Sequence, residues 1–244
     1  TRRCPRPCVN RPVLPSCTEE HSSPPMMGII QINLNHCKAA QDLLSQDIRE
    51  QRINVAIVCD QYKNFDPPYT WLADANSQAA IWVQGGNLVQ EHPARARPFF
   101  TWTRISGIYF FSVYSPPRLA DVEFSALFTN ITEEARGKRP LIIAGDFNVW
   151  STEWGCRATT LLDALALLEA VLLNTGNTPT FTGALGYSVV DLTFASDTLA
   201  YQVTSWAVSE LYTHSDHQAM VFEIEIAKAA SGTCAVLTQS ASRP

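Results

Sequence analysis

Residues 141–148 read LIIAGDFN, an apolar run that ends in a glycine, a carboxylate and an amide. The apolar part has the length and composition of a short strand buried on both faces of a sheet. Polar groups placed directly after such a strand are held by a rigid scaffold, and the following loop leaves room for a ligand. The stretch therefore predicts a buried strand with Asp146 and Asn148 at its functional end.

The same arrangement recurs along the chain. Strand-like runs are predicted at 29–34 (IIQINL), 54–59 (NVAIVC), 107–113, 187–195 and 218–226. The polar residues that follow, interrupt or precede these runs are Asn33, Asn35, Asp60, Tyr114, Asp191, Asp216 and His217. Each one alone is more often a cap or turn residue, so the prediction of a site depends on their joint occurrence in this order.

The remaining pattern predicts an α/β fold. Helical spacing of apolar residues covers 38–52, 119–136 and 158–173, and further strands are expected at 79–83, 99–105 and 200–208. Helices alternate with strands at both ends, whereas the middle resembles an antiparallel sheet. This mixture predicts two packed mixed sheets flanked by helices. We expect one domain over residues 28–226, a disordered linker or tail over 1–27 and a C-terminal linker over 227–244.

Composition narrows the classes of protein. Charged residues give a net charge of −5, which argues against a general polyanion binder but leaves room for an enzyme whose acidic catalytic groups lower the sum. No apolar run approaches the roughly 18 residues of a membrane span, so we expect no membrane partner. The 7 cysteines are scattered and odd in number, which favours reduced thiols in an intracellular protein.

The N-terminal segment contains a cysteine and histidine series that has two interpretations. Cys4, Cys8, Cys17 and His21 are ligand types that zinc uses. Their spacing matches no common zinc finger, and the surrounding proline-rich sequence favours a solvated linker. Both interpretations stay open, with the linker favoured.

An acidic residue inside an apolar strand is the strongest chemical signal. Asp191 lies between Val190 and Leu192, and a buried carboxylate is costly unless it is paired. His217 is a natural partner, because a carboxylate fixes the imidazole tautomer and favours its charged form.

Such a pair suits phosphodiester cleavage. The imidazolium can donate to the phosphoryl oxygens, and a second carboxylate held by an asparagine can orient or deprotonate water. Two other acidic groups can hold Mg²⁺, and amide and phenol donors can stabilise the transition-state oxygens.

The order of these motifs resembles a known superfamily. The segments QIN at 31–33, VCDQ at 58–61, VY at 113–114, GDFN at 145–148, VDLTF at 190–194 and SDH at 215–217 are similar to those of the endonuclease/exonuclease/phosphatase superfamily. That superfamily includes DNase I, apurinic/apyrimidinic repair endonucleases, sphingomyelinases and inositol polyphosphate 5-phosphatases. The phrases AGDFNVWSTEWG, TPTFTG, SVVDLTFAS and SDHQAMVFEI most resemble endonuclease domains of non-LTR retrotransposons, in particular insect elements that insert into telomeric repeats.

This resemblance implies a fold and an activity. The fold would be a DNase I-like four-layer α/β/β/α sandwich. The activity would be that of a Mg²⁺-dependent endonuclease, with Mn²⁺ as a substitute. It would nick one strand of double-stranded DNA and leave a 3′-hydroxyl for target-primed reverse transcription. The reverse transcriptase region of the same polyprotein would be a partner, and the nucleus the site of action.

The resemblance also implies residue roles. Asp146, supported by Asn148, would act on the attacking water, and His217, oriented by Asp191, would contact the scissile phosphate. Asn33 and Tyr114 would be phosphate donors; Asp60 and Asp216, with Asn35, would lie on the metal side.

The chain departs from the superfamily pattern at several positions. The superfamily usually has Glu where Asp60 stands and Asp where Asn35 stands, which alters the expected metal contacts. Ser188 stands where repair enzymes have Trp, and Pro117 where they have Asn, so we expect no abasic-site repair role.

A glycine-containing segment predicts a hairpin beside the site. Two glycines separate strand-like flanks here, and the tip is apolar and aromatic, as in wedges that enter the minor groove. The alternative is an ordinary surface turn. The residues expected to contact DNA are Thr180, Phe181, Gly183, Ala184, Leu185, Gly186 and Tyr187, with Lys63, Arg118 and Arg157 on phosphates and Arg95, Arg97 and Arg104 as weaker candidates.

Two other functions compete with the nickase. A phosphatase or phosphodiesterase acting on a lipid or inositol phosphate would need a dense basic pocket, against which the acidic balance argues. A catalytically weak DNA-binding module is motivated by Asn35 and Asp60, because weakened metal binding would abolish turnover.

Overall fold

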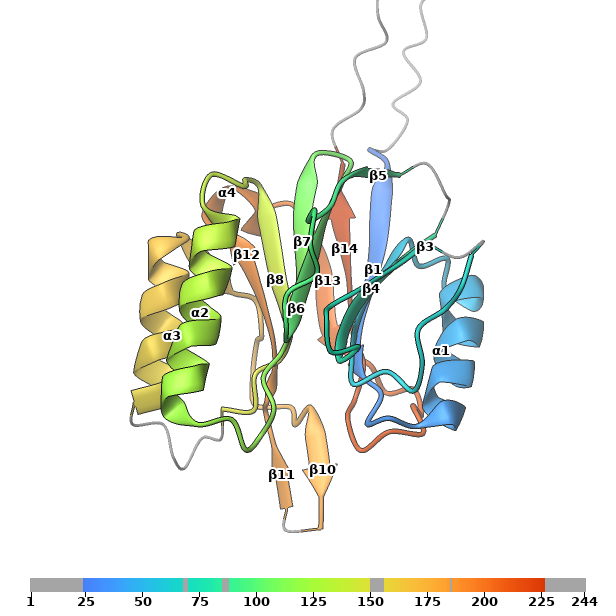
Figure 1. Ribbon diagram of the computed structural model, residues 1–244. Helices are drawn as coiled ribbons and strands as arrows, with labels where there is room; N and C mark the ends of the chain where they lie inside the picture. Colours follow the sequence, from blue (N-terminus) through green and yellow to red (C-terminus); the bar gives the residue numbers. More distant parts are fainter. Residues whose placement is uncertain (1–23, 68–69, 85–87, 150–155, 185, 227–244) are drawn as a thin grey trace, which may run out of the picture.

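Two six-stranded sheets face each other in the computed structural model, which describes residues 24–67, 70–84, 88–149, 156–184 and 186–226 (Figure 1). Sheet A has the order β13 (Val203–Val208), β14 (Met220–Glu225), β1 (Met26–Asn33), β2 (Val55–Cys59), β4 (Ala79–Val83), β3 (Thr70–Ala73). Sheet B has the order β5 (Val89–Glu91), β6 (Phe100–Ile105), β7 (Ile108–Tyr114), β8 (Leu141–Asp146), β12 (Asp191–Ser196), β9 (Ala170–Leu172).

Helices cover the outer faces of the sheets. In Figure 1, α1 (Lys38–Glu50) lies outside sheet A, whereas α2 (Asp121–Ala135) and α3 (Cys156–Leu167) lie outside sheet B. A short helix, α4 (Asp197–Ala200), follows β12. The predicted α/β/β/α sandwich is therefore confirmed. Within the described ranges, no helix is long and apolar enough to cross a membrane.

Alternation along the strands builds a core between every pair of layers. In β1, Ile29 packs between the sheets with Phe110 and Ile142, whereas Ile30 packs under α1 with Leu44. Successive strand residues point to opposite faces, so one strand contributes to both cores. A third core lies between sheet B and the helices α2 and α3, where Phe124 and Phe128 are buried. Apolar residues on both faces of the central strands thus require helices outside each sheet.

Strand direction gathers the polar groups at one end of the sandwich. β1 runs parallel to β2, and β7 runs parallel to β8, so the carboxyl ends lie together within each sheet. The side chain of Asn33 at the end of β1 contacts that of Asp146 at the end of β8, so the two sheets share this end. β12 is antiparallel to β8 and begins at that end, with Asp191 opposite Asp146. The hairpin of β10 (Phe181–Gly183) and β11 (Gly186–Ser188) projects from the same end (Figure 1).

Three predicted boundaries are wrong. The helix expected over 158–173 ends at Leu167, and β9 follows, because residues 170–172 pair with β12 at the sheet edge. The strand expected over 187–195 is split between β11 and β12, which belong to different sheets. Order also begins before residue 28, because Met26 and Met27 pair with β14. Residues 1–23, with the cysteine and histidine series, and residues 227–244 lie outside the described ranges.

Candidate active site

Gly145 allows β7 and β8 to approach at the site. Its φ of +149° is one that side chains rarely adopt, and an added Cβ would lie 1.9 Å from the carbonyl oxygen of Val113. Only glycine fits this approach, which sets Asp146 beside Tyr114 on the neighbouring strand. The glycine of GDFN is thus a packing requirement of the site.

The carboxylate of Asp146 is fully buried and surrounded by donors. Its Oδ2 accepts hydrogen bonds from the side-chain amides of Asn33 and Asn148, each at 2.8 Å. Its Oδ1 accepts the backbone N–H of Asn148 at 2.9 Å. The amide of Asn148 also donates to the carbonyl of Ser115 at 3.0 Å. These contacts hold the carboxylate in one orientation.

Burial and charge set the protonation of Asp146. Burial, together with the neighbouring charge of Asp191, raises the pKa of Asp146 to about 7. The positive charge of His217 and the donors from Asn148 and Asn33 oppose this rise. A carboxylate with a pKa near neutrality can exchange a proton with water at neutral pH.

Asp191 and His217 form a buried pair. The Nδ1 of His217 lies 2.7 Å from Oδ2 of Asp191, and both side chains are almost fully buried. Burial alone would lower the pKa of His217, but the charge and hydrogen bond of Asp191 outweigh it and raise the pKa to about 9. His217 is therefore an imidazolium at neutral pH, held by Nδ1 with Nε2 left for another contact.

A short loop network fixes the backbone around His217. The hydroxyl of Thr213 donates to the carbonyl of His217 at 2.8 Å, and the hydroxyl of Ser215 accepts the His217 N–H at 3.1 Å. Ser215 also donates to the carbonyl of Asn33 at 2.8 Å, which ties the loop to β1. The ring of Phe181 lies against the imidazole, with centroids 4.8 Å apart.

Asp60, Asp216 and Tyr114 surround this centre. An oxygen of Asp216 lies 3.8 Å from Nε2 of His217. Burial and the charge of Asp216 raise the pKa of Asp60, which the positive charges of His36 and His217 oppose. Burial, Asp60 and Asp146 raise the pKa of Tyr114, so its hydroxyl stays protonated as a donor.

The carboxylates of the site fit a divalent cation. Oxygens of Asp146 and Asp191 lie within 4.8 Å of each other and of a ring nitrogen of His217. The other carboxylate oxygen of Asp191, Oδ1, is buried and has no hydrogen-bond partner among the described residues. A buried, unpaired carboxylate oxygen is costly unless a cation or donor satisfies it. Asp60 and Asp216 add half-buried carboxylates at the edge of the same centre.

The structure separates the predicted residues into three groups. Direct hydrogen bonds join Asn33, Asp146 and Asn148, and another joins Asp191 and His217. Asp60, Tyr114 and Asp216 interact with these groups electrostatically. The side chain of Asn35 is exposed, and its backbone N–H donates to Oδ1 of Asn33 at 2.8 Å. A metal role for Asn35 stays a prediction.

The predicted DNA-contacting residues differ in exposure. In the hairpin, Gly183 pairs with Gly186, and Tyr187 is 76% exposed; Leu185 lies outside the described residues. Thr180 is fully buried instead, and its hydroxyl accepts the backbone N–H of Asp191 at 3.1 Å. A direct DNA contact by Thr180 is therefore wrong for this structure, because its hydroxyl positions the strand.

The basic residues predicted to contact DNA phosphates differ in exposure and in internal contacts. Lys63 and Arg118 are exposed. The guanidinium of Arg157 donates to the carboxylate of Asp121 at 2.6 Å and to the carbonyl of Leu119 at 2.5 Å. These internal contacts compete with the phosphate contact predicted for Arg157.

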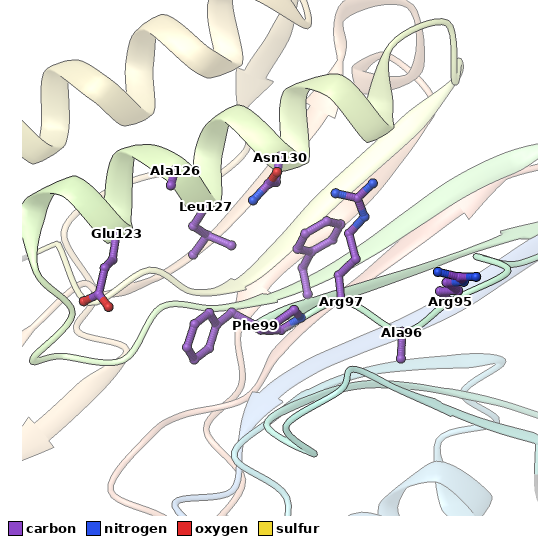
Figure 2. A pocket seen from close by; sticks show the side chains of 10 residues that line it. Arg95, Ala96, Arg97, Phe99, Glu123, Ala126, Leu127 and Asn130 are labelled. Carbon is purple, nitrogen blue, oxygen red and sulfur yellow. The ribbon is translucent and has the colours of Figure 1, made fainter.

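Two of the weaker candidates for phosphate contacts, Arg95 and Arg97, line a cavity away from the catalytic groups. The cavity has a volume of about 490 Å³. Figure 2 shows the side chains of Arg95 and Arg97 between α2 and the segment before β6. Arg97 is paired there with Glu134 at 3.5 Å. The catalytic carboxylates do not line this cavity.

Some residues of the site were not found by sequence reasoning. They are Gln31, Ser115, Thr213 and Ser215, which support the catalytic groups, and His36, which lies beside Asp60. Gln31 carried a usable signal, since an amide inside the apolar run IIQINL needs partners when buried. The others occur in loops, where polar residues are ordinary.

Comparisons with known proteins agree with this geometry. The sequence profile described as endonuclease-reverse transcriptase matches residues 108–221. No curated protein matches the sequence. The fold is similar to the "endonuclease domain of TRAS1, a telomere-specific non-LTR retrotransposon", with 27% identity, a TM-score of 0.71, and coverage of 83% of this chain and 99% of that chain.

Two more distant structures share the fold alone. A 3′-5′ exonuclease from Neisseria meningitidis is 15% identical with a TM-score of 0.63, over 82% of this chain and 100% of that chain. An AP endonuclease from Leishmania major is 12% identical with a TM-score of 0.62, over 82% of this chain and 88% of that chain. The profile match spans Asp146, Asp191 and His217, and together with the fold and the site it supports a metal-dependent nuclease domain that is similar to endonuclease-reverse transcriptases and to the endonuclease domain of a non-LTR retrotransposon.

Proposed function

We propose that this chain is a Mg²⁺-dependent endonuclease that nicks one strand of double-stranded DNA and leaves a 3′-hydroxyl. One observation carries the proposal: a buried carboxylate with a raised pKa, Asp146, lies on the strand beside the buried Asp191–His217 pair. This places a group that can take a proton beside a group that can donate one.

Asp146 acts on the attacking water. In its ionised form it orients a water molecule and accepts its proton as the oxygen attacks phosphorus. Asn33 and Asn148 both donate to Oδ2, so the carboxylate cannot rotate away from the water. Correct orientation of the reacting groups supplies much of the rate in such reactions.

His217 acts on the phosphate. Attack on phosphorus adds negative charge to the non-bridging oxygens, and the imidazolium is held ready to donate to them from Nε2. Asp191 keeps the ring charged and fixes its Nδ1 side. The protonated hydroxyl of Tyr114 supplies a further donor at the end of β7.

A divalent cation fits on the acidic side. Asp60 and Asp216 would hold it, with Asn35 as the further residue that the family resemblance suggests. When bound, Mg²⁺, or Mn²⁺ in its place, neutralises charge on the phosphate and its leaving oxygen. Asp60 is one methylene shorter than the Glu usual in the superfamily, so its reach to the cation is shorter.

The hairpin supports a choice of target. It projects from the catalytic end (Figure 1). The ring of Tyr187 in β11 is 76% exposed. Such aromatic groups enter the minor groove at deformable steps. The similarity to the endonuclease domain of a telomere-specific element supports a preference for telomeric repeats. On this proposal the nick primes reverse transcription in the nucleus, by a reverse transcriptase region of the same polyprotein.

The two alternatives have less support. A phosphatase for lipid or inositol phosphates needs cations around the site, yet the hydrogen bonds that join Asn33, Asn148 and Asp146, and Asp191 and His217, among the described residues involve no Lys or Arg. A catalytically weak binding module would not need the buried Asp191–His217 pair, which is costly to keep.

A plasmid assay tests the proposal. Two supercoiled plasmids, one with a telomeric-repeat insert, are incubated with the protein and Mg²⁺, and the nicks are mapped to the nucleotide. The variant His217→Ala should lose nicking, whereas His214→Ala, at an exposed position nearby, should keep it. Nicks clustered in the insert support the whole proposal, and uniform nicks reject the telomeric preference. Equal nicking by His217→Ala and the wild type would reject the assigned site.

A further inference from the structure

Gln31 has no part in the proposed chemistry, yet it links both catalytic strands. It lies two residues before the end of β1 in sheet A, is 1% exposed, and points between the sheets as Ile29 and Asn33 do. A buried amide in an apolar strand is unfavourable unless all of its polar atoms find partners. Its partners therefore show what it holds in place.

The side chain of Gln31 spans the gap between the sheets. Its Nε2 donates to the carbonyl of Gly145 at 3.2 Å and to the carbonyl of Leu192 at 3.1 Å. Gly145 directly precedes Asp146, and Leu192 directly follows Asp191. One amide group thus contacts the backbone next to each catalytic carboxylate.

The remaining atom of the amide is also satisfied. Oε1 of Gln31 accepts the hydroxyl of Thr193 at 2.7 Å. The hydroxyl of Thr193 in turn accepts the indole N–H of Trp206 at 3.2 Å. An amide has two donor hydrogens and one carbonyl, so both amide hydrogens of Gln31 and its carbonyl oxygen have partners here. A fully connected buried network is rigid and permits one arrangement of its members.

We infer that Gln31 is a positioning residue for the nuclease, which fixes the strands of Asp146 and Asp191 relative to each other and so aligns the Asp191–His217 pair with Asp146. The inference rests on the proposed function of this site. β8 and β12 are already neighbours in sheet B, with Gly145 opposite Leu192. Gln31 adds hydrogen bonds from the opposite sheet to this pair of residues, each of which is adjacent in sequence to a catalytic carboxylate.

A merely structural role makes a different prediction, and the chain offers a matched control. Ser112 on β7 donates its hydroxyl to the carbonyl of Val58 on β2 at 3.0 Å, which is also a buried hydrogen bond between the sheets. Neither residue adjoins Asp146 or Asp191 in the sequence. Loss of this bond therefore reports the general effect of removing a bond between the sheets.

The test compares Gln31→Met with Ser112→Ala. Met fills a similar volume and forms none of the three bonds. Single-turnover and steady-state nicking of supercoiled plasmid with Mg²⁺ should show at least about a tenfold loss of kcat in Gln31→Met, because small displacements of reacting groups are costly. KM should change less than about twofold, since the DNA-contacting surface is untouched. Ser112→Ala should keep kcat within about twofold.

Two further variants keep the test decisive if Gln31→Met does not fold. Thr193→Val removes the hydroxyl that orients the Gln31 amide and should lower kcat in the same way. Thr193→Ser keeps the hydroxyl and should have the kcat of the wild type. Equal kcat for wild type, Gln31→Met and Thr193→Val would overturn the inference, as would a change confined to KM or an equal loss in Ser112→Ala.

An independent readout separates this inference from the proposed function. In the metal-free protein, the proton between Nδ1 of His217 and Asp191 is observed by NMR. Its resonance should move in Gln31→Met and stay in Ser112→Ala. If the wild type nicks no DNA, the proposed function fails while this signal still decides whether Gln31 positions the pair. An unchanged resonance in Gln31→Met would overturn the inference.

Discussion

The variant Asp191→Asn removes one charge from the site and leaves its shape. Asn has the size of Asp, and its carbonyl oxygen can still accept the Nδ1–H of His217, which lies at 2.7 Å in the wild type. Only the negative charge beside the imidazole is lost. The change therefore isolates electrostatics from packing.

The magnitude follows from the pKa of His217. Burial is the largest influence and lowers this pKa; the charge and hydrogen bond of Asp191, with smaller contributions from Asp146 and Asp216, outweigh burial to give about 9 against an ordinary value of 6.5. Asp191 supplies the two largest raising influences, so its loss should lower the pKa of His217 by up to about 2.5 units (9 minus 6.5), or about 3 kcal/mol. At pH 7.5 a fall of that size takes the protonated fraction from about 97% to about 10%, so nicking should drop by up to about tenfold from protonation alone.

The same change should move the other limb of the pH profile. The charge of Asp191 also raises the pKa of Asp146, so its loss lowers that pKa. Nicking needs Asp146 ionised and His217 protonated, and the wild-type optimum should lie between about 7 and about 9. In Asp191→Asn the rise and the fall of the profile should both shift to lower pH.

Single-turnover nicking from pH 5 to pH 10 measures both limbs, and NMR titration of the imidazole in metal-free protein reports His217 directly. Asp197→Asn, at the exposed first residue of α4, is the control and should leave the profile unchanged. A profile of Asp191→Asn that keeps its alkaline limb near pH 9 would refute the reasoning.

Three further predictions follow from the same contacts. Gly145→Ala should destabilise the fold by more than about 3 kcal/mol in denaturant unfolding, because its Cβ would overlap the carbonyl of Val113; a loss below about 1 kcal/mol would contradict this. Asp146→Asn should lower nicking at least about a hundredfold. The pKa of Asp146 is raised on folding, so the wild type loses stability as the pH rises from about 4 to about 7. The Tm of Asp146→Asn minus that of the wild type should therefore be larger at pH 8 than at pH 4.5. An equal difference at the two pH values would reject the buried charge. Tyr187→Ala should abolish any site preference without slowing nicking of random sequence, whereas Tyr201→Ala, at 92% exposure after α4, should change neither; unchanged nick mapping in Tyr187→Ala would reject the hairpin as the reader.

Local sequence patterns predicted those features of the structure that depend on neighbouring residues in the chain. The apolar runs beside Asn33, Asp60 and Asp146 form buried strands, because their residues fit both faces of a covered sheet. An acid inside an apolar strand needs a partner, and the structure places His217 beside Asp191. The order of motifs led to the resemblance to endonuclease domains of non-LTR retrotransposons and to the sandwich fold, and the comparisons confirm this similarity and this fold.

Features that depend on distant contacts were not predictable. Residues 158–173 read as one apolar helix, but the positive φ of Glu169 ends that path and β9 pairs with β12. The sequence placed Thr180 in an exposed hairpin, yet it is buried, and its hydroxyl accepts the backbone N–H groups of Val190 and Asp191. Gln31 contacts Leu192, from which it is 161 residues distant in sequence. No window of sequence contains such pairs.

The most direct test of the central claim is the chemistry of the cleaved end. Supercoiled plasmid is treated with the protein and Mg²⁺, and the products are offered to a DNA polymerase that extends only 3′-hydroxyl ends. The wild type should give nicked circles that are extended without end repair. Chelation of the metal or His217→Ala should leave the plasmid intact. Plasmid that stays supercoiled with the wild type, or nicks that cannot be extended, would contradict a metal-dependent nickase that leaves a 3′-hydroxyl.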